Sequence, residues 1–475
     1  MKRVISLLSA LFVSLLLTTS VFSAPTAETF TERYVNNTLY AGSGSATGTA
    51  TAGGNTTISL AADASTNDDD YNNYGIRIIS GTGTANECRR ITDYDATGGA
   101  TEKLATVDAA WTINPDATTV YEITVGSDSN NGVSTGLYGG TNGAYATIDA
   151  CIDGRTTAIR VNILAGREYD LLAGITYAYD ADGGVSMMAG YTSAAGDGGI
   201  AIIDGQSSVG DIFNPDRPLV LSDVTLKGCT DDAIVASDTN ADNLYFYHIY
   251  ILSAGGNGMQ ATSTTFPWFI IGCQITGTTA VAYTDNGGTR HFLYNYIHDT
   301  TAGGIELSGT AAFNIFDTNG GDAISLEGGS GTFVFHNTIY NTTGDNIEIT
   351  GGTNNVILNN ILHTASGWNL NGLTTKTILV YGYNNYYLGT GGTDDGASEY
   401  KYNLGNNQTG NPDFVSVDDF DIDTSTTIDD TGYPPAGGWY GNAATGGHTE
   451  MGVVPYEETG GAAAGGGRGA RFLIQ

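Results

Sequence analysis

Positive charge is scarce in this chain, which has 17 Lys and Arg residues against 50 Asp and Glu residues and a formal net charge of −33. Phosphate groups are bound by clustered Lys and Arg side chains, so the composition argues against a nucleic-acid partner. The same surface repels an anionic polysaccharide unless bound cations bridge the two molecules. Neutral glycans, cationic partners and Ca²⁺ remain compatible with this charge.

Cysteine is scarce as well. The chain has 4 cysteines, at Cys88, Cys151, Cys229 and Cys273. Their spacing matches no zinc-binding pattern, so we interpret them as buried thiols or one incidental disulfide. After the N-terminal segment, no stretch reaches the roughly 18 apolar residues of a transmembrane helix, so no membrane span is expected.

Residues 1–23 have the features of a secretory signal peptide. A basic start, Met1-Lys2-Arg3, precedes an almost wholly apolar run from Val4 to Leu17, and small residues follow around Ser23. We therefore expect an exported protein, secreted or held at the cell surface.

A helical pattern is absent from Arg290 to Gly372, where short β-rich segments repeat instead. Each segment carries an anchor Asn and, ten positions later, an apolar residue; the pairs are Asn295 and Ile305, Asn314 and Ile324, Asn337 and Ile347, and Asn360 and Leu370. A repeat of this length, built from short strands, predicts a solenoid. Stacked coils would bring the Asn side chains into a hydrogen-bonded ladder along the axis, which gives these residues a structural role.

Residues 125–170 contain VGSDSNNGVSTG, AYATIDACIDG and TTAIRVNILAGREYD. This run resembles the first part of secreted right-handed parallel β-helix proteins with the pectate-lyase-like fold. The resemblance implies an all-β fold, a right-handed single-stranded parallel β-helix over residues 125–400. It also implies an amphipathic helix over 144–152 that caps the first coil, with Ile148 and Cys151 or Ile152 facing inward.

The flanking segments predict further divisions. Residues 24–124 form a small β-rich module, and SGTGTANECRRITDYDATGGATEKLATVDAAWTINPDATTVYEI resembles a module of phage structural proteins, which implies attachment or assembly. Residues 401–457, with GNPDFVSVDDFDIDTSTTIDDTG and MGVVPYE, resemble the closing segment of secreted β-helix proteins. Residues 458–475 are rich in Gly and Ala and predict a flexible tail.

Carboxylates gather at one edge of the predicted coils. The residue after an inward Ile points outward, which places Glu306, Glu348 and the nearby Glu327 on the outer face. Asp322 and Asp345 fall in the preceding turns of adjacent coils, roughly 5 Å apart. Three interpretations stay open: a solvated acidic face, a Ca²⁺ site formed by Asp322, Asp345 and Glu348, or a catalytic acid/base pair for glycosidic cleavage drawn from Glu306, Asp322 and Asp345.

Two enzyme families with this fold supply further candidates. KGCTDDAIVAS resembles the Gly-Asp-Asp-Cys run of polygalacturonases and implies catalytic roles for Asp231 and Asp232, although Cys229 precedes the pair and the other motifs of that family do not occur at a suitable phase. Pectate-lyase-like enzymes use an Arg or Lys base, and Arg290 is the candidate here, near His291 and His298. His298 is also explained as a turn residue bonded to its neighbours.

Aromatic residues crowd the middle and late coils, as core filler or as flat surfaces for sugar rings. Trp368 and Tyr294 are the carbohydrate-binding candidates. The sequence predicts a protein that recognises an extracellular polysaccharide or cell-surface glycan, as a lyase or hydrolase if it is an enzyme. The alternative is a non-catalytic structural protein, an adhesin or a phage-tail-like surface protein. Whether it forms a homo-oligomer is left open.

Overall fold

The computed structural model describes most of residues 31–387, and then residues 391, 401–403, 409, 414–416 and 419–422. The gaps before residue 388 are 98–102, 131–143, 153–158, 172, 178–185, 196, 216–218, 237–242, 263–266, 286–287, 328–330, 353, 373–378 and 383. The expected signal peptide and C-terminal tail lie outside the described residues. Chain contacts define two units, one of Phe30–Ala241 with Tyr247–Leu252 and one containing Asp242–Phe246 and Ser253 onward.

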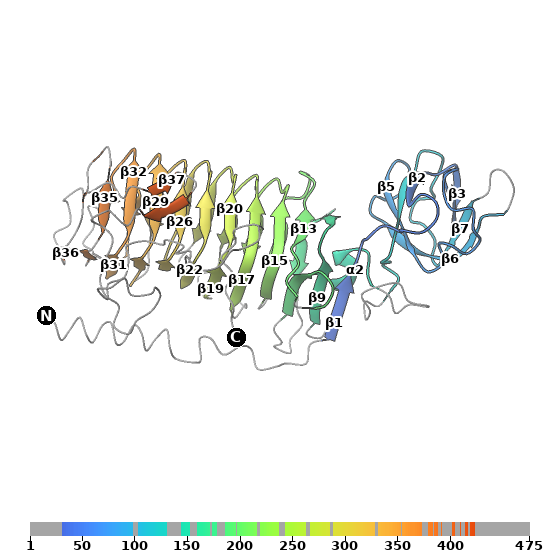
Figure 1. The fold of residues 1–475 in the computed structure, drawn as a ribbon, viewed down its shortest axis with the longest axis horizontal. Coiled ribbons are helices and arrows are strands. Elements are labelled where there is room, and N and C mark those ends of the chain that lie inside the picture. The colour runs from blue at the N-terminus through green and yellow to red at the C-terminus, as the bar shows by residue number, and fades with distance from the viewer. Residues whose placement is uncertain are drawn as a thin grey trace. The chain divides into compact units, whose positions relative to one another are not determined.

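The first unit begins with a small antiparallel sheet (Figure 1). Its order is β2-β8-β5-β6-β7-β4-β3, and alternating residues of these strands bury a core that includes Ile76, Tyr94 and Tyr121. The strands are β2 (Thr47–Thr49), β3 (Ala52–Gly54), β4 (Thr57–Ser59), β5 (Gly75–Ser80), β6 (Cys88–Asp95), β7 (Leu104–Val107) and β8 (Val120–Thr124).

The first coils of a parallel β-helix complete this unit. β1 (Thr31–Val35) pairs in parallel with β9 (Ile159–Leu164), so a strand that the sequence division assigns to the N-terminal module lies in the β-helix. The short helix α2 (Ile148–Ile152) buries Ile148 and Cys151, whereas Ile152 is half-buried. The other strands are β10 (Glu168–Asp170), β11 (Ile175–Tyr177), β12 (Ser186–Tyr191), β13 (Ala201–Asp204), β14 (Phe213–Pro215), β15 (Leu219–Lys227) and β16 (Ile234–Ala236); β17 (Leu244–Leu252) contributes residues to both units.

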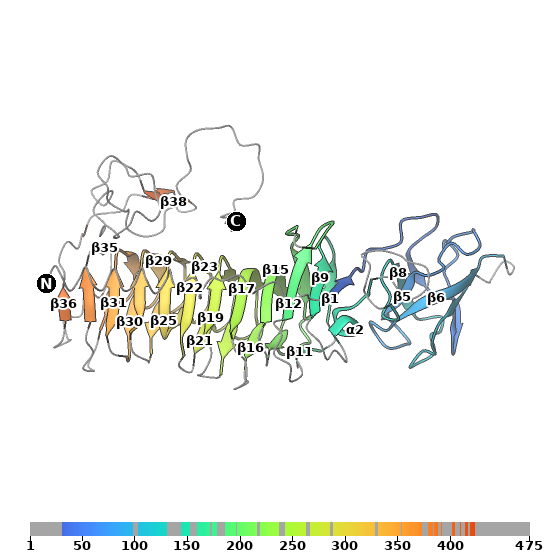
Figure 2. The ribbon, with the colours of Figure 1, turned by 90° about the horizontal axis from the view of Figure 1, so that it is seen from below.

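The later coils, in the second unit, each contribute one strand to three parallel sheets (Figures 1 and 2). The first sheet contains β19 (Trp268–Ile271), β22 (Arg290–Leu293), β25 (Gly309–Ala312), β28 (Phe333–Phe335), β31 (Asn355–Leu358) and β34 (Leu379–Gly382). The second contains β20 (Gln274–Thr276), β23 (Tyr296–His298), β26 (Ile315–Asp317), β29 (Thr338–Thr342), β32 (Ile361–Ala365) and β35 (Asn385–Tyr387). The third contains β18 (Met259–Ala261), β21 (Val281–Asp285), β24 (Gly303–Glu306), β27 (Ile324–Leu326), β30 (Ile347–Ile349) and β33 (Leu370–Asn371).

The predicted inward and anchor positions are confirmed by the register. Met259, Tyr283, Ile305, Ile324, Ile347 and Leu370 align along the axis and are at most 1% exposed. The Asn ladder runs from Asn295 through Asn314, Asn337 and Asn360 to Asn384. In each step Oδ1 of one Asn accepts bonds from both the backbone N–H and the side-chain amide of the Asn in the preceding coil, as at Asn295 and Asn314.

The described C-terminal strands are few. β36 (Lys401–Asn403) pairs in parallel with β34. β37 (Phe414–Ser416) and β38 (Asp419–Ile422) form an antiparallel pair. The rest of the expected closing segment lies outside the described residues. No helix in the described part of the chain is long and apolar enough to cross a membrane.

Candidate functional site: a polar column and its carboxylates

The outer surface of the third sheet carries one polar side chain per coil. Parallel register aligns these residues, which we call the polar column: Gln260, Thr284, Glu306, Ser325, Glu348 and Asn371. Each follows an inward apolar residue directly, so strand alternation turns it outward. The members contact one another, since the Thr284 hydroxyl donates a hydrogen bond to Oε2 of Glu306. Hydrogen-bonding groups are thus repeated at about the 4.8 Å strand spacing.

Asp322 and Asp345 stand in the turns before β27 and β30, as predicted, and each is bonded to the next coil. Oδ1 of Asp322 accepts the backbone N–H of Asp345 at 2.6 Å, and Oδ1 of Asp345 accepts that of Trp368 at 2.5 Å. A Cβ at Gly344 would lie 2.3 Å from Oδ1 of Asp322, so glycine at this position admits the carboxylate. Both aspartates therefore stabilise stacked turns, a role that the sequence reading did not assign to them.

Glu348 joins this turn to the polar column. Burial raises its pKa to about 7, and its hydrogen bond to Asp322 and the negative charges of Asp322 and Asp345 act in the same direction. Glu348 is therefore mostly protonated below about pH 7, well above the usual range of a glutamate. The pKa of Glu327 is also raised, first by partial desolvation of its carboxylate and then by the negative charge of Glu306.

Arg290 does not lie beside these carboxylates, contrary to the expectation from the sequence. Strand alternation in β22 turns Arg290 inward together with Phe292, and its side chain is fully buried. Its Nη2 lies 3.0 Å from Oδ1 of Asp285, and its Nε donates to the hydroxyl of Tyr283 at 2.6 Å. An enclosed guanidinium in an ion pair cannot reach a substrate on the outer surface, so Arg290 is not available as a lyase base.

His298 points outward from β23, in the second sheet, where it contacts its own neighbours. Its Nδ1 lies 2.8 Å from Asp299 Oδ2, its Nε2 lies 2.8 Å from Gln274 Nε2, and its ring stacks on Tyr296 at 4.3 Å. These contacts show His298 bonded to its neighbours, as expected, but at the end of a strand and not in a turn.

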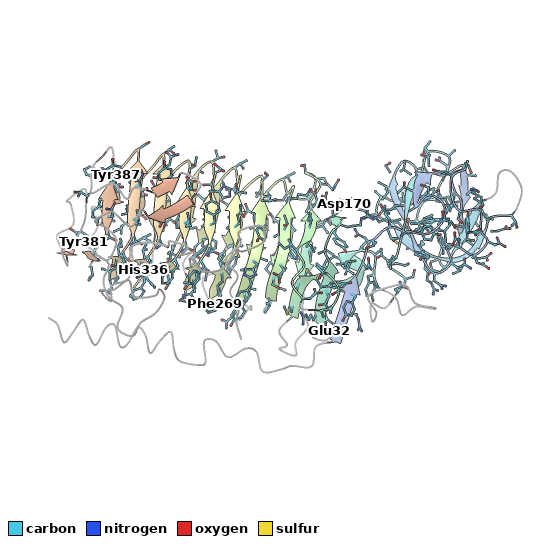
Figure 3. All side chains as sticks on the ribbon, viewed as in Figure 1. Glu32, Asp170, Phe269, His336, Tyr381 and Tyr387 are labelled. Atoms are coloured by element: carbon cyan, nitrogen blue, oxygen red, sulfur yellow. The ribbon has the colours of Figure 1, made fainter. Side chains whose placement is uncertain are left out.

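The two aromatic candidates separate in the structure. Trp368 is half-buried; its backbone N–H donates to the Asp345 carboxylate, and its ring packs against Gly391. Tyr294 lies in the turn between β22 and β23, where its ring stacks on Phe313 at 4.9 Å. Other outer rings also stack on each other, including Phe269 on His291 and Phe313 on His336. Phe269 and His336 lie on the lower side of the β-helix in the view of Figure 3, whereas Tyr387 lies on its upper side. A stacked ring has a face covered, so these columns present mainly ring edges to solvent.

The expected Ca²⁺ ligands already have protein partners. Both Asp345 oxygens are engaged, by the Trp368 N–H and by the Asn371 amide at 2.6 Å, and Glu348 bonds to Asp322. This donor set fits a cation poorly. In the first unit, by contrast, Asp211, Asp231 and Asp232 bring ligand oxygens within 4.8 Å of one another.

Asp231 and Asp232 differ in their surroundings, since Asp231 is exposed and Asp232 is buried. The Asp232 N–H donates to Oδ1 of Asp211 at 3.2 Å, which repeats the Asp322–Asp345 arrangement. Asp211 was not among the candidate site residues predicted from the sequence. The signal was available: Asp211, Asp232, Asp322 and Asp345 all precede an inward apolar residue by two positions.

Comparisons with known proteins agree with the fold. Residues 258–385 match the family described as right handed beta helix region. A comparison with curated proteins finds no match. Among solved structures, a PL6 family polysaccharide lyase from Pseudopedobacter saltans has 10% identity and a TM-score of 0.31, covering 55% of this chain and 90% of that one. The catalytic domain of a GH87 alpha-1,3-glucanase in complex with nigerose has 11% identity and a TM-score of 0.30, covering 76% of this chain and 90% of that one.

These TM-scores are too low to support an argument about this chain, so the fold rests on its own strand register and on the family match. Parallel pairing of equivalent strands, an inward apolar column and the match to residues 258–385 lead to one conclusion. The protein is a right-handed parallel β-helix protein with a small β-rich module near its N-terminus.

Proposed function

We propose that the polar column binds an extracellular glycan. The observation that carries this proposal is the register of Gln260, Thr284, Glu306, Ser325, Glu348 and Asn371, which presents hydrogen-bonding groups at regular intervals on one outer surface. A polymer of hydroxylated sugars offers donors and acceptors along its length, so it can pair with successive coils. Trp368, whose backbone N–H bonds to Asp345, stands in the turn before β33 and is the aromatic candidate near the Asn371 end of the column.

The charge of the column favours a neutral or amine-bearing glycan. Glu306 and Glu348 lie on the column, with Asp322 and Asp345 beside it, and the cationic Arg290 is enclosed in the interior. A uronic-acid polymer would meet carboxylates without a compensating positive group among the described residues of this surface.

Hydrolysis is a natural extension of binding at this site. Glu306 and Glu348 are two strands apart with Ser325 between them, a separation of about 9.6 Å between equivalent backbone positions. Inverting glycosidases hold their two carboxyl groups roughly 6.5–9.5 Å apart, with room for a water molecule. In this proposal Glu348, whose pKa is raised to about 7, is the general acid, and Glu306 is the base.

The test combines a glycan-binding array with an assay for reducing and unsaturated ends. We expect binding to neutral or amine-bearing glycans, and release of reducing ends that falls at least about 100-fold in Glu306→Gln and in Glu348→Gln with binding retained. Tyr340→Ala, on the second sheet, is the control and should leave both properties unchanged. Absence of binding to every glycan would remove the proposal, and binding without cleavage would limit it to recognition.

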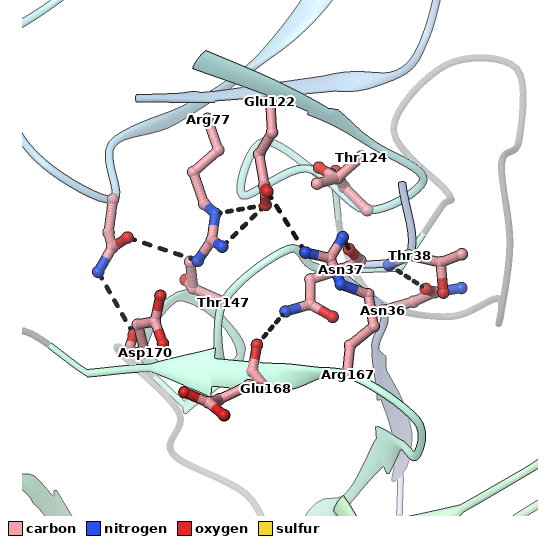
Figure 4. Close-up of polar contacts among 12 residues, drawn as sticks. Asn36, Asn37, Thr38, Arg77, Glu122, Thr124, Thr147, Arg167, Glu168 and Asp170 are labelled. Atoms are coloured by element: carbon pink, nitrogen blue, oxygen red, sulfur yellow. Dashed lines mark hydrogen bonds and ion pairs between the residues drawn. The ribbon is translucent and has the colours of Figure 1, made fainter. Parts of the chain in front are cut away.

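A second candidate function, attachment, is favoured by the joint between the module and the first coil (Figure 4). Arg77 of β5 and Glu122 of β8 form a buried ion pair with a 2.8 Å contact. Arg167 of the β-helix reaches Glu122 at 3.3 Å and donates to the Asn37 carbonyl at 2.7 Å. A module held in this way is suited to fixing the β-helix to a larger assembly. A truncated chain that lacks the module and keeps full glycan binding would assign the two functions to separate parts.

A further inference from the structure

The outer surface of the first sheet is apolar over six coils. Register aligns two outward columns on it, which we call the apolar face: Phe269, His291, Thr310, Phe333, Val356 and Val380, and Ile271, Leu293, Ala312, Phe335, Leu358 and Gly382. The residues between them, such as Ile270, Phe292 and Val334, are fully buried in the interior. None of the twelve outward residues is Asp, Glu, Lys or Arg, although the chain has a net charge of −33.

The single titratable side chain among the twelve is uncharged at neutral pH. Burial lowers the pKa of His291 to about 4, and the Arg290 charge beneath it lowers the pKa further. Tyr294, Phe313 and His336 border the apolar face with stacked rings whose centroids lie 4.9 and 5.1 Å apart. Leu293, Phe333 and Val356 remain partly exposed. Phe269, Thr310, Ala312 and Gly382 are buried and the other eight outward residues are partly exposed, so solvent reaches an uncharged and mainly apolar surface in each of these coils except that of β25. Apolar surface of this kind marks interaction sites on soluble proteins.

We propose that the apolar face binds the same face of a second copy, in a two-fold symmetric dimer. In a two-fold interface each residue patch meets itself, so like charges in the patch would oppose each other. For a chain at −33, a surface without ionised groups avoids that cost, whereas the acidic polar column does not. An uncharged apolar patch is therefore the surface through which two such acidic copies can associate.

The size of the apolar face sets the strength of this association. Six strands span about 24 Å at the strand spacing, and four residues along each strand cover about 13 Å. The flat footprint is smaller than the roughly 800 Å² per partner of a standard interface, so the dimer is expected to be weak and concentration-dependent. Salt should strengthen it, because screening reduces the long-range repulsion between two acidic chains.

Sedimentation velocity of the full chain tests the proposal. We expect a shift from monomer toward dimer as protein concentration rises, and a larger dimer fraction at about 0.5 M NaCl than at about 0.05 M. Phe333→Lys and Leu293→Lys should each weaken association at least tenfold, because each would bury a lysine against the uncharged surface of the second copy. Ser366→Lys, at an exposed position off the apolar face, should associate as the parent chain does.

A cysteine scan separates loss of contact from loss of folding. The four native cysteines are buried, so a thiol added at the surface reports on its own position. Phe333→Cys, near the centre of the apolar face where a two-fold axis brings a residue closest to its own copy, should form a disulfide-linked dimer on mild oxidation, and Ser366→Cys should not. A monomer at every protein and salt concentration overturns the proposal, whether the apolar face is then covered by another segment of this chain or by a different partner. Equal cross-linking at positions 333 and 366 overturns it as well.

Discussion

Glu348 shows how one side chain acquires its chemistry from neighbours in other coils. In isolation it is an ordinary glutamate; in the β-helix it bonds to Asp322, lies near Asp345 and keeps its proton to a pH of about 7 because burial and these charges raise its pKa. The folded protein then binds more protons than the unfolded chain between the ordinary glutamate pKa and about 7. Through this group, stability should therefore fall as pH rises across that window.

The variant Glu348→Gln tests this linkage. Because it removes the repulsion with Asp322 and Asp345, we expect a higher melting temperature than the parent at pH 8 and little difference at pH 4.5. The measurement is thermal unfolding across that pH range. Glu306→Gln, whose carboxylate bonds to Thr284, is the matched control. A parent and a Glu348→Gln variant with parallel pH profiles would contradict the assigned proton.

Arg290 is a residue that sequence patterns placed wrongly. Its charge and its nearness to His291 and His298 in the sequence suggested a surface base. Alternation in β22 instead requires it inside, where Asp285 and Tyr283 bond to the guanidinium. A charged side chain that points into the core departs from the usual pattern of inward apolar residues. The Arg290 charge is accommodated because its two partners, Asp285 and Tyr283, lie on β21, which the local sequence around Arg290 does not reveal.

The Asn ladder holds in register the turns that join the first sheet to the second sheet. Asn337 receives the backbone and side-chain amides of Asn314 and donates to Asn360 and to the Ala311 carbonyl. These groups are buried, so each unmade bond leaves a desolvated polar atom.

Asn337→Asp keeps the shape and the acceptor but loses the donor. We expect a loss of about 2–4 kcal/mol in the free energy of unfolding, because the Ala311 carbonyl loses its amide donor, Asn360 Oδ1 loses one of its two donors, and a charge is buried. Chemical denaturation measures this loss. Ser366→Ala, at an exposed position, should change stability by less than about 0.5 kcal/mol. A small effect of Asn337→Asp would mean that water or a neighbour replaces the ladder bond.

A buried network of charged side chains joins the N-terminal module to the first coil. Glu122 is shared by Arg77 and Arg167, and the Arg77 and Glu122 side chains are only 4% and 8% exposed. Breaking a buried pair on one side leaves an uncompensated charge.

We expect Glu122→Gln to lower the stability of the first unit by about 3 kcal/mol. Lys227→Met removes a cation shared by Glu168 and Asp204, whose side chains are 38% and 13% exposed, and it should cost less than Glu122→Gln because the Lys227 ammonium is open to water. Differential scanning fluorimetry of the two variants supplies the comparison. Equal effects would show that the joint is open to water.

At this scale the sequence determined the repeat and the inward side of each coil. The Asn anchors, the apolar residue ten positions later and the outward glutamates follow from local spacing, because alternation in a strand fixes which side chain points inward. These assignments were confirmed at Ile305, Ile324 and Ile347. Outside these repeated positions, the tertiary structure alone decided which side chains meet across coils. Successive ladder steps differ between 19, 23, 23 and 24 residues. Contacts such as Arg290 with Asp285 and β1 with β9 therefore depend on turn geometry and strand register, which are set by packing between coils and have no signature within a single coil.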